Sequence, residues 1–156
     1  MKIIITGGHG AIAGELLHHF KKEKKNKIFL ISNKKQKNKN QKNFKAFYQD
    51  LSKPIKINLK ADLVIHCASK HYFSDRKVDK KYLKKINLEM CKNLAKFCNK
   101  NKIKKLIFLS SIDVYGSPKR KKNIFSENSK LKPENWYAMS KLKSERIFLN
   151  KKNKFN

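Results

Sequence analysis

Residues 5–15 read ITGGHGAIAGE, a glycine-rich segment whose spacing indicates the class of fold. It follows an apolar run over residues 2–6 and leads into a helical pattern. The spacing Gly7-x-x-Gly10-x-x-Ala13 puts small residues where a tight turn, close approach of the backbone to pyrophosphate and helix–strand packing require them. The free N–H groups and positive dipole end at the start of the helix favour a phosphate there. The spacing alone also fits a purely structural turn, so other residues must decide.

Apolar runs alternate with helical periodicity along the rest of the chain, which is typical of a parallel α/β sheet. We expect strands at 2–6, 27–32, 44–48, 62–67 and 105–111, and helices at 11–24, 79–101 and 135–150. The connections are a polar loop at 33–43, a weak helix or turn at 54–59 and a loop at 112–134. Right-handed crossovers on both faces give a doubly wound parallel sheet of about five strands, a Rossmann fold. No linker or repeat interrupts it, so residues 1–156 form one domain.

Two helices have apolar residues at core spacing. On the first helix these are Ile12, Leu16, Leu17 and Phe20; on the second they are Tyr82, Leu83, Ile86, Met90, Leu94, Phe97 and Cys98.

The chain is strongly basic, with a formal net charge of +29. Only Arg76, Arg120 and Arg146 are arginine, so 37 of the 40 basic residues are lysine (40 − 3). The lysines fall in short runs at expected loops and helix ends, and no nucleic-acid-binding module is recognisable. We therefore interpret them as a solvated surface and disfavour nucleic acid as a partner.

The cysteines and the apolar segments bear on the compartment. Cys67, Cys91 and Cys98 are odd in number and form no C-x-x-C pair, as expected of a reduced cytoplasmic protein. No apolar run approaches the ~18 residues of a membrane span, and the apolar start is too short for a signal peptide. We therefore expect a cytoplasmic protein with no membrane partner, and we expect no metal site.

The end of the second strand bears on cofactor choice. An acidic residue there would hold the ribose 2′-hydroxyl of NAD. The sequence instead reads Ser32-Asn33-Lys34-Lys35, with two cations and no carboxylate. A 2′-phosphate would be favoured beside them, so the sequence favours NADP over NAD.

Tyr137 and Lys141 stand four residues apart on the expected last helix and therefore share a face. An ammonium beside a phenol favours the phenolate and lowers the tyrosine pKa, which suits acid–base chemistry. Ser110 and Ser111 end the fifth expected strand, at the sheet edge where α/β proteins place ligands. A helix-surface tyrosine is the alternative interpretation of Tyr137.

Taken together, these features resemble the extended short-chain dehydrogenase/reductases, the NAD(P)-dependent nucleotide-sugar epimerase/dehydratase group. The motifs, in order, are TGGHGAIAG at 6–14, Asp50-Leu51, DLVIHCAS at 62–69, Asn87, LSSIDVYG at 109–116 and Tyr137-x-x-x-Lys141 with Glu145.

The resemblance implies hydride exchange between the nicotinamide and a sugar carbon. It implies Ser111 as the group that aligns the substrate oxygen, Tyr137 as the general acid/base, and Lys141 as the group that binds the nicotinamide ribose and tunes Tyr137. The cofactor-binding residues that we expect are Gly7, Gly10, Ala11, Ile12, Asn33, Lys34, Asp50, Leu51, Cys67, Ala68, Ser69, Asn87 and Lys141. Among the histidines, we expect His66 to be a packed histidine rather than a base.

The chain also departs from the family's pattern. Members continue with a sixth strand, usually a seventh, and a carboxyl-terminal lobe that grips the sugar nucleotide, whereas this sequence ends at Asn156. We therefore expect an uncovered edge on the fifth strand and a substrate pocket only half built. Ala11 replaces the usual aromatic residue of the loop, and Ala13 replaces its third glycine.

Three functions remain open. The first is an NADP- or NAD-dependent epimerase, dehydratase or reductase of nucleotide sugars. The second is a cofactor-binding protein without turnover, and the third is a basic module for nucleic acid or anionic surfaces. The family resemblance also implies a homodimer through the two long helices at 79–101 and 135–150.

Overall fold

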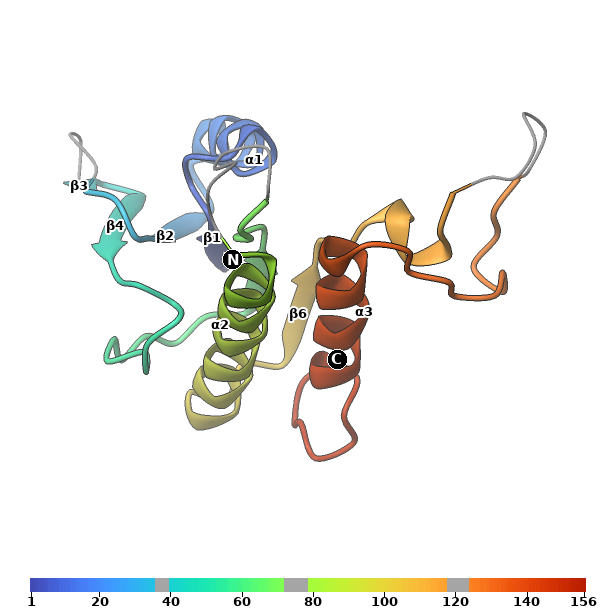
Figure 1. Cartoon of the computed structure of the whole chain (residues 1–156). Coiled ribbons are helices and arrows are strands. Elements are labelled where there is room, and N and C mark those ends of the chain that lie inside the picture. The colour runs from blue at the N-terminus through green and yellow to red at the C-terminus, as the bar shows by residue number, and fades with distance from the viewer. Residues whose placement is uncertain (36–39, 72–78, 118–123) are drawn as a thin grey trace.

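The computed structural model describes residues 1–35, 40–71, 79–117 and 124–156 (Figure 1). In chain order its elements are β1 (Lys2–Thr6), α1 (Ala11–Lys22), β2 (Lys27–Ser32), β3 (Asn40–Gln41), β4 (Phe44–Tyr48), β5 (Leu63–His66), α2 (Lys80–Lys100), β6 (Lys105–Phe108), the 3-10 helix η2 (Ile112–Tyr115) and α3 (Trp136–Phe148).

The strands form one sheet in the order β3-β4-β2-β1-β5-β6. Every pairing is parallel except that of β3 with β4. The central strand β1 aligns Ile4 with Phe29 of β2 and with Val64 of β5. The expected doubly wound sheet of five parallel strands is confirmed. The carboxyl ends of these strands share one edge, where ligands of such sheets bind.

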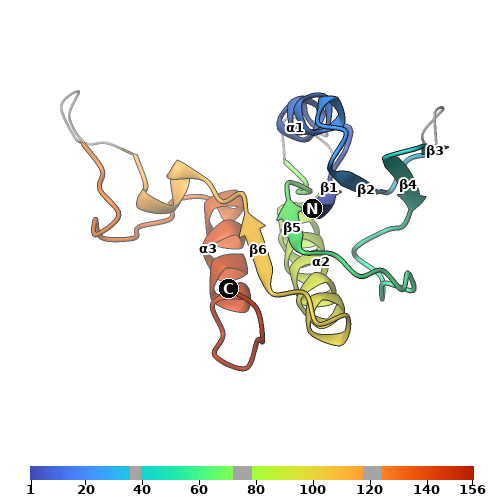
Figure 2. The same cartoon turned by 180° about the vertical axis from the view of Figure 1, so that it is seen from behind.

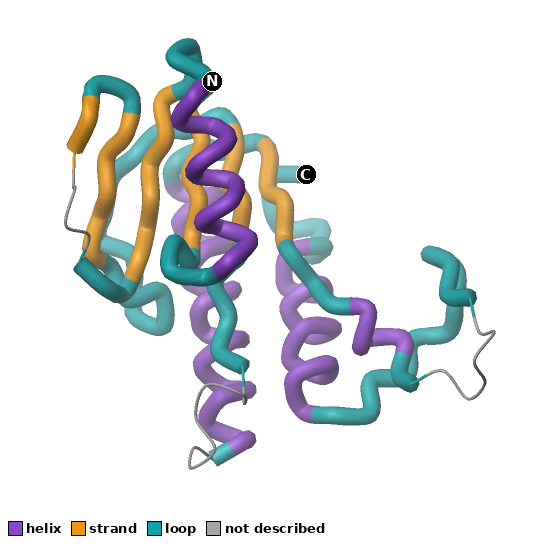
Figure 3. The backbone as a smooth tube through the Cα atoms, turned by 90° about the horizontal axis from the view of Figure 1, so that it is seen from above, coloured by secondary structure: helices purple, strands orange, loops and turns teal. Residues whose placement is uncertain are grey.

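Helices cover both faces of the sheet (Figure 3). Ile3 and Ile5 of β1 belong to the apolar cluster under Ala13 and Leu17 of α1. Ile4, the residue between them, belongs to the other cluster, which includes residues of α2 and α3. The view from behind shows α2 and α3 side by side (Figure 2), and they pack against each other. Burial on both faces explains why the strands are continuous apolar runs.

Side-chain caps set the starts of the two long helices. The Asp79 carboxylate accepts a hydrogen bond from the Lys81 N–H, at 2.8 Å, and α2 begins at Lys80. The Asn135 side chain accepts one from the Ala138 N–H, also at 2.8 Å, and α3 begins at Trp136. These caps satisfy N–H groups that have no partner within the helix. The sequence therefore located both helix starts to within one residue.

The expected weak helix or turn at 54–59 is wrong. Residues 54–59 form neither a helix nor a strand. Three residues of this segment pack against the apolar cluster that includes residues of α2 and α3, here called the α2 cluster: Ile55, Ile57 and Leu59. The residues between them, Lys56 and Asn58, are exposed. Inward-facing residues at a spacing of two are typical of an extended chain, not of a helix.

Other expectations need smaller corrections. The polar loop at 33–43 contains β3, although its residues 36–39 lie outside the described part. The loop at 112–134 contains η2, and the fifth parallel strand ends at Phe108 instead of residue 111. Ile12 and Tyr82 were expected in the core but are 60% and 55% exposed. Both lie in the first turn of their helices but on the solvent side, whereas the next residues, Ala13 and Leu83, are buried.

The outer edge of β6 is not bare at its amino end. The Asn156 N–H donates to the Lys104 carbonyl at 2.9 Å, and the Leu106 N–H donates to the Asn156 carbonyl at 2.7 Å. This is the pattern of a parallel pairing. Phe155 is buried beside Phe148. The expected uncovered edge is therefore corrected: the last residue of the chain pairs with the first part of the strand.

Candidate functional site

The turn after β1 brings the backbone of two strand ends into close contact. Gly7 has φ +81°, and a Cβ there would lie 2.7 Å from the Ala68 nitrogen, so only glycine fits. The Gly7 N–H donates to the Ile31 carbonyl at 3.2 Å, and the Gly10 N–H donates to the Gly7 carbonyl at 2.9 Å. The turn is thus fixed by contacts with both neighbouring strands.

Helix α1 begins directly after this turn without a side-chain cap. Its N-cap is Gly10, which has no side chain to accept a hydrogen bond, and its first turn contains no acidic residue. The first-turn N–H groups and the positive end of the helix dipole are therefore left for an anion. Two expected cofactor residues, Ala11 and Ile12, lie in this turn and are exposed.

A cavity of about 340 Å³ lies beside the turn at the carboxyl edge of the sheet. It brings together nine of the expected cofactor-binding residues, from four separate segments: Gly7, Gly10, Asn33, Lys34, Asp50, Leu51, Cys67, Ala68 and Ser69. It does not include Ala11, Ile12, Asn87 or Lys141. Its other lining residues, which are not in the expected set, are His9, Ile31, Ser32, Gln49, Lys70 and Met90.

At the end of β2, one wall of this cavity has no carboxylate. Ser32 Oγ accepts a hydrogen bond from the Lys34 N–H at 3.1 Å, which orders the turn that presents Asn33 and Lys34. The nearest acidic wall residue along the chain, Asp50, uses its Oδ1 to accept hydrogen bonds from the Ser52 N–H and hydroxyl. A serine can accept a hydrogen bond from the backbone N–H two residues later, so Ser32 is the sequence signal that could have identified this turn.

Cys67 forms a neutral part of the wall. Burial raises the pKa of its thiol to about 11, against a smaller opposing effect of the Lys141 ammonium. The thiol is therefore protonated near neutral pH. All three cysteines are free, as expected.

Behind the cavity, His66 is buried at the end of β5. Its Nδ1 lies 2.7 Å from Thr6 Oγ1, and its Nε2 lies 3.6 Å from Cys91 Sγ. Thr6 Oγ1 also accepts a hydrogen bond from the Ala68 N–H at 3.2 Å. Burial, followed by the nearby Lys141 ammonium, lowers the pKa of His66 to about 3. His66 is therefore a neutral packed histidine that joins β1 to β5, as the sequence predicted.

Tyr137 and Lys141 lie on α3, on the same side of the sheet as α2. Lys141 is 4% exposed, and its Nζ donates to the Leu109 carbonyl at 2.7 Å. The same Nζ lies 5.6 Å from the centre of the Tyr137 ring and 4.8 Å from that of Phe108. Burial lowers the pKa of Lys141 below its ordinary value. The expected adjacency of phenol and ammonium is present in the structure.

Ser111 caps η2, where its Oγ accepts a hydrogen bond from the Asp113 N–H at 3.3 Å. Because η2 packs against α3, Ser111 lies on the segment that faces the helix of Tyr137 and Lys141. The preceding residue, Ser110, donates instead to Glu145 of α3. The two adjacent serines therefore have different partners.

Two aromatic neighbours of Tyr137 were not predicted. The His71 ring lies 4.4 Å from the Tyr137 ring in an edge-to-face arrangement, and the Trp136 ring lies 6.1 Å from it. Partial burial lowers the pKa of His71, against an opposing effect of Asp113. Within the described ranges, no group of three or more His, Cys, Asp or Glu side chains could hold a metal ion, and no helix is long and apolar enough to cross a membrane.

The sheet order, the glycine turn and the cavity at the carboxyl edge define an α/β protein of the Rossmann class, with a candidate dinucleotide site. More specifically, the chain belongs to the NAD dependent epimerase/dehydratase family, whose model matches residues 3–156.

Comparison with individual proteins agrees with this assignment. The chain is 32% identical, over 99% of its length, to an ADP-L-glycero-D-manno-heptose-6-epimerase of Brachyspira hyodysenteriae and covers 51% of that protein. The UDP-Glc/GlcNAc 4-epimerase of Campylobacter jejuni matches with a TM-score of 0.75 and 29% identity, over 94% of this chain and 47% of that one. The Bordetella bronchiseptica enzyme WbmG, solved with NAD and UDP, has the same fold, with a TM-score of 0.80, 20% identity and coverage of 98% and 50%. The chain spans about half the length of these relatives.

Proposed function

We propose that the protein is an NADP- or NAD-dependent epimerase, dehydratase or reductase that acts on a nucleotide sugar by hydride transfer, with Ser111, Tyr137 and Lys141 as its active site. The observation that supports this most strongly is the position of Lys141. Its buried ammonium donates to one backbone carbonyl, that of Leu109, and lies 5.6 Å from the centre of the half-buried Tyr137 ring, which suits a cation that acts on the tyrosine.

The residues around the cavity fit a dinucleotide. Gly7 permits close approach of the backbone, and the uncapped first turn of α1 suits a pyrophosphate. Asp50 and Leu51 would flank the adenine, and Ala68 and Ser69 would line the opposite wall. When bound, the nicotinamide supplies a hydride acceptor or donor.

The protein's own residues would manage the proton. Tyr137 would take it from a sugar hydroxyl as that carbon becomes a ketone, and would return it in the reverse step. The Lys141 ammonium would favour the phenolate, and the Ser111 hydroxyl would hydrogen-bond the same sugar oxygen. Such a site is selective because proton transfer requires the oxygen within hydrogen-bond reach of both hydroxyls.

A pair of tyrosine variants tests this function. Tyr137→Phe removes the hydroxyl that moves the proton, whereas Tyr82→Phe makes the same change at an exposed tyrosine on α2. We expect hydride transfer from NADPH or NADH to a keto-sugar nucleotide, followed by absorbance, to fall roughly 10²–10⁴-fold in Tyr137→Phe only. Cofactor binding without turnover over a broad sugar-nucleotide panel would support a binding protein and contradict the enzyme.

A pair of lysine variants tests the role of Lys141. Lys141→Met removes the buried ammonium, and Lys143→Met removes an exposed one from the same helix. We expect Lys141→Met to abolish turnover while its unfolding free energy changes by only about 1 kcal/mol, because an apolar side chain tolerates this site. Loss of activity in both variants would point to net charge instead.

The preference for NADP is a separate proposal, which rests on Asn33 and Lys34 and on the absence of a carboxylate at the end of β2. Lys34→Gln should weaken NADP binding several-fold and leave NAD binding unchanged, since only NADP has the 2′-phosphate. Lys53→Gln, at an exposed lysine outside the cavity, is the matched control. Tighter binding of NAD than of NADP by the unaltered protein would overturn the preference.

We also propose a homodimer through α2 and α3, which lie side by side on one face of the sheet. The exposed side of α2 bears several lysines, including Lys85, Lys92 and Lys96. Their mutual repulsion is screened by salt, so the dimer fraction in sedimentation experiments should rise between 0.05 and about 0.5 M salt. A monomer at both salt concentrations would exclude this dimer.

A further inference from the structure

A second cleft, of about 750 Å³, lies at the amino ends of the strands. It therefore opens at the sheet edge opposite the glycine turn. Six of its nine lining residues are lysines: Lys2, Lys21, Lys24, Lys25, Lys27 and Lys42. The cavity beside the glycine turn has only two lysines among its lining residues. A further cavity, between β6 and α3, has one. The lysines are thus concentrated here beyond the general lysine content of the chain.

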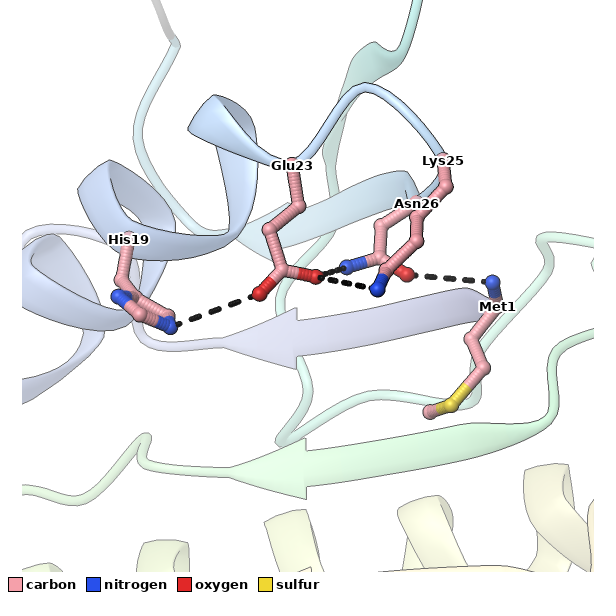
Figure 4. Close-up of polar contacts among 5 residues, drawn as sticks. All are labelled: Met1, His19, Glu23, Lys25 and Asn26. Carbon is pink, nitrogen blue, oxygen red and sulfur yellow. Dashed lines mark hydrogen bonds and ion pairs between the residues drawn. The ribbon is translucent and has the colours of Figure 1, made fainter.

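Few negative charges oppose these lysines. Asp62 is the one carboxylate in the lining, and its Oδ2 accepts a hydrogen bond from the Lys2 N–H at 2.7 Å. Glu23, just outside, is engaged by His19, Lys25 and the Asn26 amide (Figure 4). Within the described part of the chain, Lys2, Lys24, Lys27 and Lys42 form no ion pair. The cleft therefore has a large local excess of positive charge.

Hydrogen bonds hold in place the backbone segments that carry these lysines. The Lys27 N–H donates to the Met1 carbonyl at 2.8 Å, and the Met1 ammonium donates to the Asn26 side chain at 3.2 Å (Figure 4). Across the cleft, the Asn43 amide donates to the Lys21 carbonyl at 3.2 Å and so joins the end of α1 to the start of β4. The Lys21 ammonium lies 3.6 Å from the centre of the Phe44 ring. The cations thus project from ordered elements.

Like charges that face one cleft repel one another, and a bound anion removes that cost. Lysine ammoniums are compact donors suited to phosphate oxygens. The residues that line the cleft include no arginine and no aromatic residue, and the Phe44 ring beside Lys21 is buried, so the cleft offers no platform on which a base could stack. These features suit a short, highly charged anion better than a nucleic acid.

We propose that this cleft binds an oligophosphate chain, either free or as the phosphate chain of a nucleotide. The cleft is separate from the cavity beside the glycine turn, and the proposal does not depend on the function proposed above. Occupation would offset the repulsion among the lysines and stabilise the junction of β1, β2 and α1.

The test is a titration of the ¹⁵N-labelled protein with inorganic tripolyphosphate in 0.15 M salt, where charges beyond about 8 Å are screened. We expect saturable shifts of the amides of Lys2, Lys27, Asn43 and Asp62. Shifts centred on Gly7 and Gly10 would show binding at the glycine turn instead and would overturn the proposal.

Two charge-matched triple variants make the test specific. Lys2→Gln, Lys27→Gln and Lys42→Gln together remove three cations from the cleft, and Lys53→Gln, Lys56→Gln and Lys60→Gln remove three exposed cations elsewhere. By calorimetry, the cleft triple should bind tripolyphosphate about tenfold more weakly, and the control triple within about twofold of the unaltered protein. Equal weakening in both would show diffuse attraction and overturn the site.

Parallel titrations identify the source of the phosphate chain. Equal affinity for ATP and tripolyphosphate would indicate recognition of the phosphates alone, and tighter binding of ATP would indicate a nucleotide. If a short DNA duplex binds more tightly than both, and only the cleft triple abolishes its binding, the ligand is nucleic acid and the oligophosphate assignment is wrong.

Discussion

The side chain of Asn87 on α2 forms hydrogen bonds with both the N–H and the carbonyl of Lys70. Asn87 Oδ1 accepts a hydrogen bond from the Lys70 N–H at 2.8 Å, and Asn87 Nδ2 donates to the Lys70 carbonyl at 3.1 Å. The same Nδ2 donates to Ser140 Oγ on α3 at 3.2 Å. Asn87 therefore fixes the segment after β5, which lines the cavity, without lining the cavity itself.

Asn87→Ala should disrupt the site indirectly. Loss of the two backbone hydrogen bonds should lower the unfolding free energy by about 2 kcal/mol and the affinity for NAD(H) or NADP(H) roughly tenfold. Urea unfolding and calorimetry measure the two effects. Asn58→Ala, at an exposed asparagine outside the cavity, is the control and should change neither. Unaltered cofactor affinity in Asn87→Ala would contradict the positioning role.

Two glycines seven positions apart, Gly7 and Gly14, should respond oppositely to alanine. At Gly7 a Cβ would meet the Ala68 backbone at 2.7 Å and φ is +81°, whereas at Gly14 nothing lies within 4 Å. We expect Gly7→Ala to cost about 1–3 kcal/mol and to weaken cofactor binding. Gly14→Ala, in an exposed part of α1, should stabilise the protein by about 0.5–1 kcal/mol. Thermal unfolding of both variants checks this; equal effects would mean that the turn tolerates a side chain.

His66 makes stability depend on pH in a definite direction. Its pKa is about 3 in the folded protein and 6.5 in the unfolded chain. Between these values only the unfolded state binds the proton, so stability is full above pH 6.5 and falls as the pH is lowered toward 3, by up to about 5 kcal/mol.

Urea unfolding between pH 7.5 and 4.5 measures this dependence. His66→Gln should flatten the curve, and His18→Gln, at an exposed histidine, should not. A curve that stays equally steep in His66→Gln would assign the dependence to other groups.

Phe155 should contribute strongly to stability despite its position next to the last residue. It is buried, its ring lies 6.4 Å from that of Phe148, and it belongs to the α2 cluster. Phe155→Ala should cost about 3 kcal/mol in chemical unfolding. Ile124→Ala, at a residue that is 92% exposed, should cost almost nothing. A negligible effect at Phe155 would mean that the carboxyl-terminal segment does not pack against the core in solution.

Much of the fold could be predicted because its signals are local. The apolar run before Gly7, the capping residues Asp79 and Asn135, and the i, i+4 spacing of Tyr137 and Lys141 each determine their structure within a few residues. The weak helix or turn expected at 54–59 is wrong because the apolar residues there recur at a spacing of two, which is typical of an extended chain. Ile12 and Tyr82 fit the helical period, but a period does not fix which residues at the margin of an apolar face the core covers.

The parallel sheet, the glycine turn and the helix that holds Tyr137 and Lys141 can be predicted from the chain alone, because backbone sterics and apolar periodicity act over short segments. Three relationships come from the packing of the folded chain. Asn87 holds the Lys70 backbone, His66 joins Thr6 to Cys91, and six lysines from distant segments line one cleft. Those relationships arise when strands far apart in the sequence align their ends. Neither propensity nor spacing along the chain contains that information.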